Sequence, residues 1–90
     1  MLFSDLKDIL NNAKIIGKLP KKKIKYISDH SNNVNENTLL VINKNKDFKL
    51  SYLKTAISKN LKTIISNHYL KNSSLNQIIV KKLEKEISKL

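Results

Sequence analysis

The chain has 90 residues, of which 40% are hydrophobic, and carries a formal net charge of +11. This length suits one domain with a modest core, and the apolar content argues against wholesale disorder. The chain contains no cysteine, which excludes disulfides, thiolate metal sites and a cysteine nucleophile, and no apolar run approaches the ~20 residues of a membrane-spanning helix. We therefore expect a soluble, cytoplasmic protein.

The basic charge comes from lysine alone. All 18 basic residues are lysine, and none is arginine. Base-edge readout and planar phosphate recognition rely heavily on the guanidinium fork, which lysine cannot reproduce. We therefore expect mostly solvated lysines that attract nucleic acid weakly and non-specifically at low salt. The alternative is a small lysine-rich module that binds nucleic acid or an acidic partner without enzymatic activity.

The N-terminal part predicts a short helix followed by a strand. Ser4 is expected to cap a helix that ends near Asn12. The apolar face of this helix is formed by Leu6, Ile9 and Leu10. Residues 24–27, rich in β-forming side chains, predict a strand that ends in a polar loop over residues 28–37.

The middle of the chain predicts a strand–helix–strand unit. Residues 38–43 predict a strand whose residues 39–42 are apolar without alternation, which is typical of burial on both faces in a parallel sheet covered by helices. Ser51 is expected to cap the next helix and Asn60 to stop it. Residues 63–66 predict the following strand, so the unit forms a crossover between parallel strands.

The last third allows two interpretations. Ser74 and Gln77 could form a capping box that starts one helix running to Leu90. We favour a strand over residues 77–80 and then a helix from about Lys82. The predicted fold is therefore a small α/β domain of three-layer type, with a short, mostly parallel sheet of three to five strands flanked by helices.

Polar loops follow two of the predicted strands, at residues 28–37 and 44–49. Loops that long in a compact domain usually serve a function. In α/β proteins, ligands bind outside the carboxyl ends of parallel strands. We therefore expect the binding residues of this chain in these two loops.

The order and spacing of these segments resemble the N-terminal domain of a Mur ligase, nearest to the MurE type, UDP-N-acetylmuramoyl-tripeptide synthetase. The resemblance covers essentially the whole chain. It is carried by Leu6–Leu10, His30-Ser31-Asn32, Val34, Asn37–Val41, Asn45, Tyr52-Leu53, Ala56-Ile57, Asn60–Ile65 and Ile79-Val80. The chain departs from the family pattern where Asp-Ser-Arg becomes His-Ser-Asn, and three family glycines are replaced by Asn37, Asn45 and Asn60. Asparagine tolerates positive φ, so the backbone could be kept.

The resemblance implies that the domain binds the uridine-diphosphate end of a UDP-N-acetylmuramoyl-peptide. By position, the hydroxyl of Ser31 would contact the nucleotide, with Asp29 beside it. Asn45, Lys46 and Asp47 of the second loop would line the same groove, with the lysine near the diphosphate. The alternative for Ser31 is that it only bonds backbone amides within its turn.

The resemblance also implies what this chain lacks. Gly17 is its single glycine, so the glycine-rich phosphate loop of a Mur ligase is missing, and ATP and Mg²⁺ are expected only in a missing central domain. We therefore expect the front piece of a larger, peptidoglycan-forming ligase, with the remaining ligase domains as partners, no membrane partner, and no catalytic residue in this chain. His30 and His68 have no acidic partner at metal-ligand spacing, so no metal site is expected. Glu84 and Glu86 are expected to form exposed, weak ion pairs.

Overall fold

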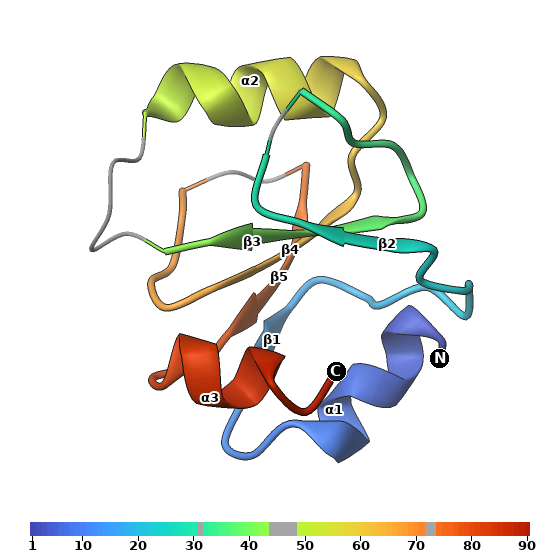
Figure 1. Cartoon of the computed structure of the whole chain (residues 1–90), viewed down its shortest axis with the longest axis vertical. Coiled ribbons are helices and arrows are strands. Elements are labelled where there is room, and N and C mark those ends of the chain that lie inside the picture. The colour runs from blue at the N-terminus through green and yellow to red at the C-terminus, as the bar shows by residue number, and fades with distance from the viewer. Residues whose placement is uncertain (31, 44–48, 72–73) are drawn as a thin grey trace.

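A computed structural model describes residues 1–30, 32–43, 49–71 and 74–90. Figure 1 shows a sheet with helices on both of its faces. The elements in chain order are the 3₁₀ turn η1 (Phe3–Asp5), α1 (Leu6–Ile9), β1 (Lys14–Ile16), β2 (Tyr26–Ser28), β3 (Thr38–Ile42), α2 (Leu50–Ser58), β4 (Thr63–Ser66), β5 (Asn76–Ile79) and α3 (Leu83–Ile87).

The five strands form one mixed sheet in the order β1-β5-β4-β3-β2. β2, β3, β4 and β5 run parallel to one another, and β1 pairs antiparallel with β5. Helix α2 covers one face, while α1 and α3 lie on the other (Figure 1). The protein is therefore a small α/β domain with a mostly parallel sheet, as the sequence predicts.

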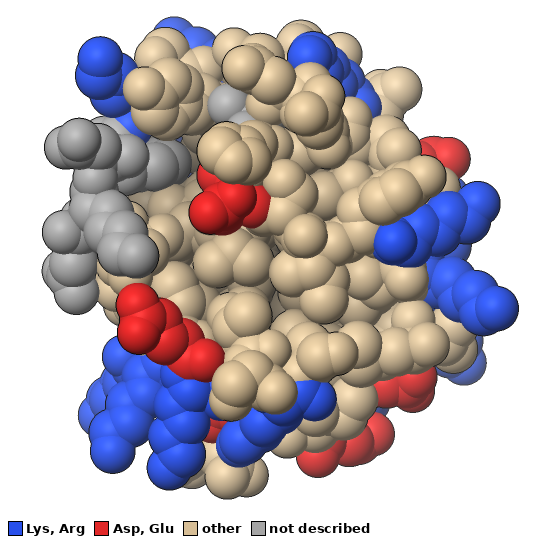
Figure 2. Space-filling model, in the orientation of Figure 1, with Lys and Arg blue, Asp and Glu red and all other residues tan. Residues whose placement is uncertain are grey.

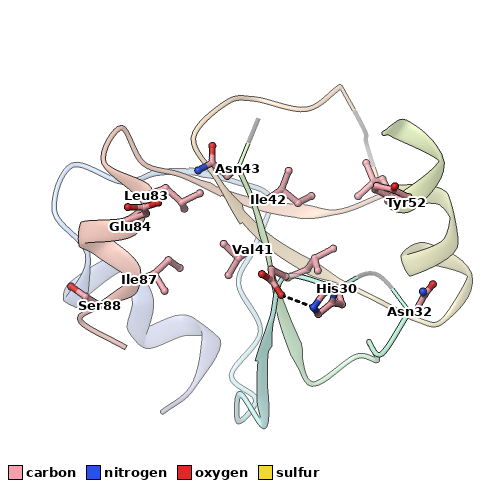
Figure 3. A pocket seen from close by; sticks show the side chains of 13 residues that line it. His30, Asn32, Val41, Ile42, Asn43, Tyr52, Leu83, Glu84, Ile87 and Ser88 are labelled. Carbon is pink, nitrogen blue, oxygen red and sulfur yellow. Dashed lines mark ion pairs between the residues drawn. The ribbon is translucent and has the colours of Figure 1, made fainter. Parts of the chain in front are cut away.

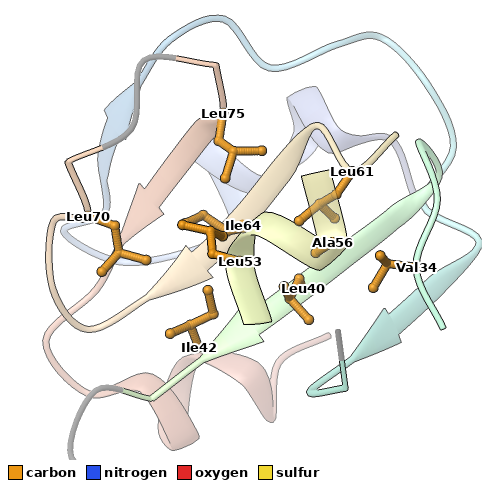
Figure 4. Close-up of a cluster of buried hydrophobic side chains, with 9 residues drawn as sticks. All are labelled: Val34, Leu40, Ile42, Leu53, Ala56, Leu61, Ile64, Leu70 and Leu75. Carbon is orange, nitrogen blue, oxygen red and sulfur yellow. The ribbon is translucent and has the colours of Figure 1, made fainter. Parts of the chain in front are cut away.

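Alternation along the central strands builds two cores. Leu40 on β3 faces α2, whereas the preceding Leu39 faces α1 and α3. The α2-side core (Figure 4) consists of Val34, Leu40, Ile42, Leu53, Ala56, Leu61, Ile64, Leu70 and Leu75. The α3-side core consists of Phe3, Leu6, Leu10, Leu39, Ile65, Ile78, Val80 and Leu83. Burial of β3 on both faces explains why its sequence is apolar without alternation.

Helix α2 differs from its prediction at its start but not at its end. It begins at Leu50, so Ser51 lies inside the helix and the N-cap residue is Lys49, whose side chain makes no capping hydrogen bond. The Ser51 carbonyl instead accepts a hydrogen bond from the Thr55 hydroxyl (3.1 Å). Asn60 follows the helix with φ +69°, the left-handed conformation that ends helices. The predicted stop at Asn60 is confirmed and the predicted cap at Ser51 is wrong.

The N-terminal segment also corrects two predictions. Ser4 lies within η1 rather than capping α1, and the Asp5 carboxylate accepts a hydrogen bond from the Leu2 amide (2.8 Å). β2 starts at Tyr26 instead of residue 24, because the preceding residues pair with the N-terminus. The amide of Phe3 donates to the Lys22 carbonyl (2.9 Å) in this pairing.

The C-terminal third is a strand followed by a helix. β5 runs parallel to β4 and α3 follows it, so the prediction of strand then helix is confirmed and a single capped helix from Ser74 is wrong. β1 lies on the other side of β5. The turn after β1 uses Gly17 at φ +86°, where an added Cβ would come within 2.5 Å of the Asn76 side-chain oxygen. Only glycine fits this turn without strain.

Candidate functional site

A groove of about 740 Å³ opens at the carboxyl edge of the sheet, around the end of β3 (Figure 3). Ligand pockets typically have volumes of ~300–1,000 Å³, so the groove is large enough for a small molecule. It runs from the α2 side of the sheet to the α3 side. Its lining consists of Asp29, His30, Asn32, Leu40, Val41, Ile42, Asn43, Tyr52, Leu53, Leu83, Glu84, Ile87 and Ser88.

The end of β2 supplies one carboxylate and the imidazole of the groove. The Ser28 hydroxyl accepts the His30 amide (3.0 Å) in a tight turn directly after β2. This turn places the Nε2 atom of His30 3.3 Å from the Asp29 Oδ1 atom. Both side chains are more than three-quarters exposed, so they remain accessible to a ligand.

The end of β3 supplies the floor and one amide. Val41 and Ile42 form an apolar surface in the middle of the groove (Figure 3). The Oδ1 atom of Asn43, the next residue, accepts a hydrogen bond from the Nδ2 atom of Asn67 at the end of β4 (3.0 Å). Tyr52 on α2 lines the α2 side and is half exposed. The β3 end therefore presents an apolar floor beside a fixed amide and an aromatic ring.

Helix α3 forms the opposite wall. Leu83, Glu84, Ile87 and Ser88 all line the groove from this helix or its last turn. The Ser88 hydroxyl donates to the Lys85 carbonyl (2.6 Å).

Glu86 anchors this wall rather than forming an exposed ion pair. Its side chain is almost completely buried, and the Lys89 Nζ atom lies 2.7 Å from its Oε2 atom. The hydrogen bond from Lys89 lowers the pKa of Glu86. Burial would raise this pKa, but the bond from Lys89 and a second hydrogen bond, from the Asn11 backbone, outweigh the effect of burial. The expectation of a solvated Glu86 is therefore wrong, because the turn after α1 packs against this face of α3.

The described lining of the groove contains acidic side chains and no lysine. Two carboxylates, Asp29 and Glu84, contribute to the lining, and no lysine does so among the residues that the structure places. On the face seen in Figure 2, the lysines gather at the margins, and the centre consists of uncharged side chains with one acidic group beside them. The net positive charge of the chain is therefore not concentrated in the described part of the groove.

Of the five residues predicted to bind the substrate, the structure places Asp29 in the groove. Ser31, Asn45, Lys46 and Asp47 lie outside the described residues. In the sequence, Ser31 lies between groove residues 30 and 32, and residues 45–47 come shortly after Asn43.

Sequence reasoning missed the wall contributed by α3. A signal was present, because a helix that follows a parallel strand begins at the carboxyl edge of the sheet, where the two loops also begin. Once residues 77–80 are read as a strand, the start of the next helix belongs to the same edge as Asp29 and Asn43. Which of its side chains face the groove depends on packing between distant segments.

Among the residues that the structure describes, no cluster of three or more histidine, cysteine, aspartate or glutamate side chains could hold a metal ion. No helix in the described ranges combines the length and apolar character needed to cross a bilayer.

No protein-family model matches the chain, and no curated protein matches it significantly.

Proposed function

We propose that this chain is a substrate-recognition domain that binds a nucleotide-linked sugar in the groove at the end of β3. The observation that carries this proposal is the position of the groove, which opens where β2 and β3 end and where both polar loops begin. Pockets at the carboxyl edge of a parallel sheet are the usual ligand sites of α/β proteins. An apolar floor with a few polar groups at its rim is the usual composition of a small-molecule site.

The resemblance to the N-terminal domain of Mur ligases leads us to propose a UDP-N-acetylmuramoyl-peptide as the ligand. Asp29 lies in the groove, and Ser31, Asn45, Lys46 and Asp47 remain proposed contacts. We assign recognition, and no step of catalysis, to this chain. A cytoplasmic location and further ligase domains that bind ATP and Mg²⁺ belong to the same proposal.

A titration of the isotope-labelled protein with uridine diphosphate, followed by NMR, tests this function. The amides of Asp29, Asn43 and Leu83 should shift together as the groove fills, whereas the amide of Lys7 on α1, outside the groove lining, should stay in place. No shift at millimolar ligand would contradict the proposal. Shifts confined to lysine-rich segments, together with salt-sensitive binding of nucleic acid, would favour the basic binding module instead.

A further inference from the structure

Lys59 connects the end of α2 to a residue of the groove. Its Nζ atom donates a hydrogen bond to the backbone carbonyl of Asn32 (2.5 Å), which lies 27 residues earlier in the chain. Asn32 lines the groove, whereas Lys59, the C-cap residue of α2, does not. Lys59 therefore holds a groove residue from a position outside the groove.

Other contacts fix the chain on either side of Asn32. Before it, the Ser28 hydroxyl accepts the His30 amide (3.0 Å) within a turn of two residues. After it, Val34 is buried in the α2-side core. The hydrogen bond from Lys59 differs from that of the turn, because it ties the backbone of Asn32 to a helix. It therefore fixes where this part of the groove wall lies relative to α2, the helix that also supplies Tyr52 to the lining.

The ammonium group of Lys59 is suited to bias the position of this carbonyl without locking it. A hydrogen bond from a charged donor is stronger than one between neutral groups. A cation near the C-terminal end of a helix also interacts favourably with the helix dipole. Solvent weakens both effects, because Lys59 is exposed. The bond can therefore break and reform while the domain stays folded.

We infer, on the basis of the proposed function, that Lys59 is a positioning residue, which holds Asn32 in the groove wall and raises the affinity for the ligand without touching it. When only a fraction of the molecules has the binding conformation, the affinity falls in proportion to that fraction. Without the bond from Lys59, the Asn32 backbone would spend part of its time away from its position beside α2. The groove would then be complete in fewer molecules.

The affinity for uridine diphosphate, measured by calorimetry in the wild type and in variants of Lys59, tests this inference. Lys59→Met keeps a long side chain without the donor and should bind about fivefold more weakly, the effect of losing one hydrogen bond of ordinary strength. Lys59→Arg keeps a charged donor and should retain most of the wild-type affinity. The matched control is Lys62→Met, which removes the same charge from another exposed lysine outside the described lining. This control separates the hydrogen bond from general attraction between lysines and the diphosphate, and it should bind as the wild type does.

The amide of Asn33 gives a second readout that needs no ligand. It belongs to the same peptide group as the Asn32 carbonyl, so its NMR resonance should move in Lys59→Met and stay in place in Lys62→Met. If this amide stays in place in Lys59→Met, or if Lys59→Met weakens binding no more than Lys62→Met does, the inference is wrong while the proposed function stands. If the wild type does not bind uridine diphosphate at millimolar ligand, the proposed function fails together with the inference.

Discussion

Val41 and Ile42 are neighbours on β3 that face opposite sides of the sheet and line the same groove. Ile42 belongs to the α2-side core, and Val41 packs against the α3-side core. The groove therefore wraps around the end of a buried strand instead of lying on one face of the sheet. A ligand in it would contact both helical layers, which explains how segments as distant in the sequence as Tyr52 and Ile87 can form one site.

Replacing Gly17 with alanine should destabilise the fold. The residue has φ +86°, and an added Cβ would come within 2.5 Å of the Asn76 Oδ1 atom, which also accepts the Lys18 amide (3.2 Å). We expect a loss of about 1–2 kcal/mol in the free energy of unfolding, measured by urea denaturation. Asn60→Gly is the matched control, because it places glycine at another positive φ (+69°) and should change stability by less than about 1 kcal/mol. An unchanged midpoint for Gly17→Ala would show that the turn after β1 is not constrained as described.

Gln77 should be the most sensitive polar residue of the core. It is fully buried on β5, and its amide accepts the Leu70 N–H (2.9 Å) and donates to the Leu70 carbonyl (2.6 Å). Gln77→Leu would leave both backbone groups without this partner in the interior. We expect a loss of about 2–4 kcal/mol in the free energy of unfolding, since each unsatisfied buried group costs about 1–3 kcal/mol.

Thr63→Val is the matched comparison, because it removes a buried polar atom that finds no hydrogen-bond partner among the described residues. Valine has nearly the same shape, so stability should stay the same or rise by up to about 1 kcal/mol. Equal losses for Gln77→Leu and Thr63→Val would mean that burial alone, and not the pairing with Leu70, makes position 77 sensitive.

Glu86 should make the stability of the domain depend on pH in the acidic range. Its pKa is lowered in the folded state, chiefly by the hydrogen bond from Lys89, so the folded state favours the ionised carboxylate. The resulting stabilisation is fully present above the pKa of glutamate in the unfolded chain and is lost as the pH falls through the lower folded-state pKa. Glu86→Gln should therefore reduce stability at neutral pH and flatten the loss of stability on acidification, both followed by thermal denaturation.

Glu36→Gln serves as the control for this measurement, because Glu36 pairs with Lys22 on the surface and such pairs contribute little. It should leave the pH profile close to that of the wild type. A wild-type profile for Glu86→Gln would show that the contact between α3 and the turn after α1 does not depend on this carboxylate.

The sequence predicted the central strands well and the termini of several elements poorly. β3 is apolar from Leu39 to Ile42 and β4 is buried along its whole length. A strand that must bury both faces has few alternative registers. The predicted start of β2 is wrong because residues 22–24 pair with the N-terminal segment. No local sequence pattern indicates that contact. Local preference predicts that Ser4 and Ser51 cap helices, but the Ser4 amide donates to the Pro20 carbonyl (3.1 Å) within η1, and Ser51 lies inside α2.

For the groove, the sequence indicated the two loops but not the wall opposite them. Asp29 could be assigned from its place after a strand, whereas Ile87 and Ser88 belong to the site only because α3 packs beside β3. Glu86 is likewise buried only because α3 packs against segments that are distant in the sequence. Periodicity predicts which residues share a helix face, but it does not say which neighbour that face meets.

Filling the groove from α3 tests the central claim most directly. Ser88 lines the groove, and Ser58, at the end of α2, does not; both are exposed, and both donate a hydroxyl hydrogen bond to the carbonyl three residues earlier. Ser88→Trp should weaken the binding of uridine diphosphate at least tenfold by calorimetry, and Ser58→Trp should bind it as the wild type does. Equal affinity in the two variants, or no binding by the wild type at millimolar ligand, would contradict the assignment of the site.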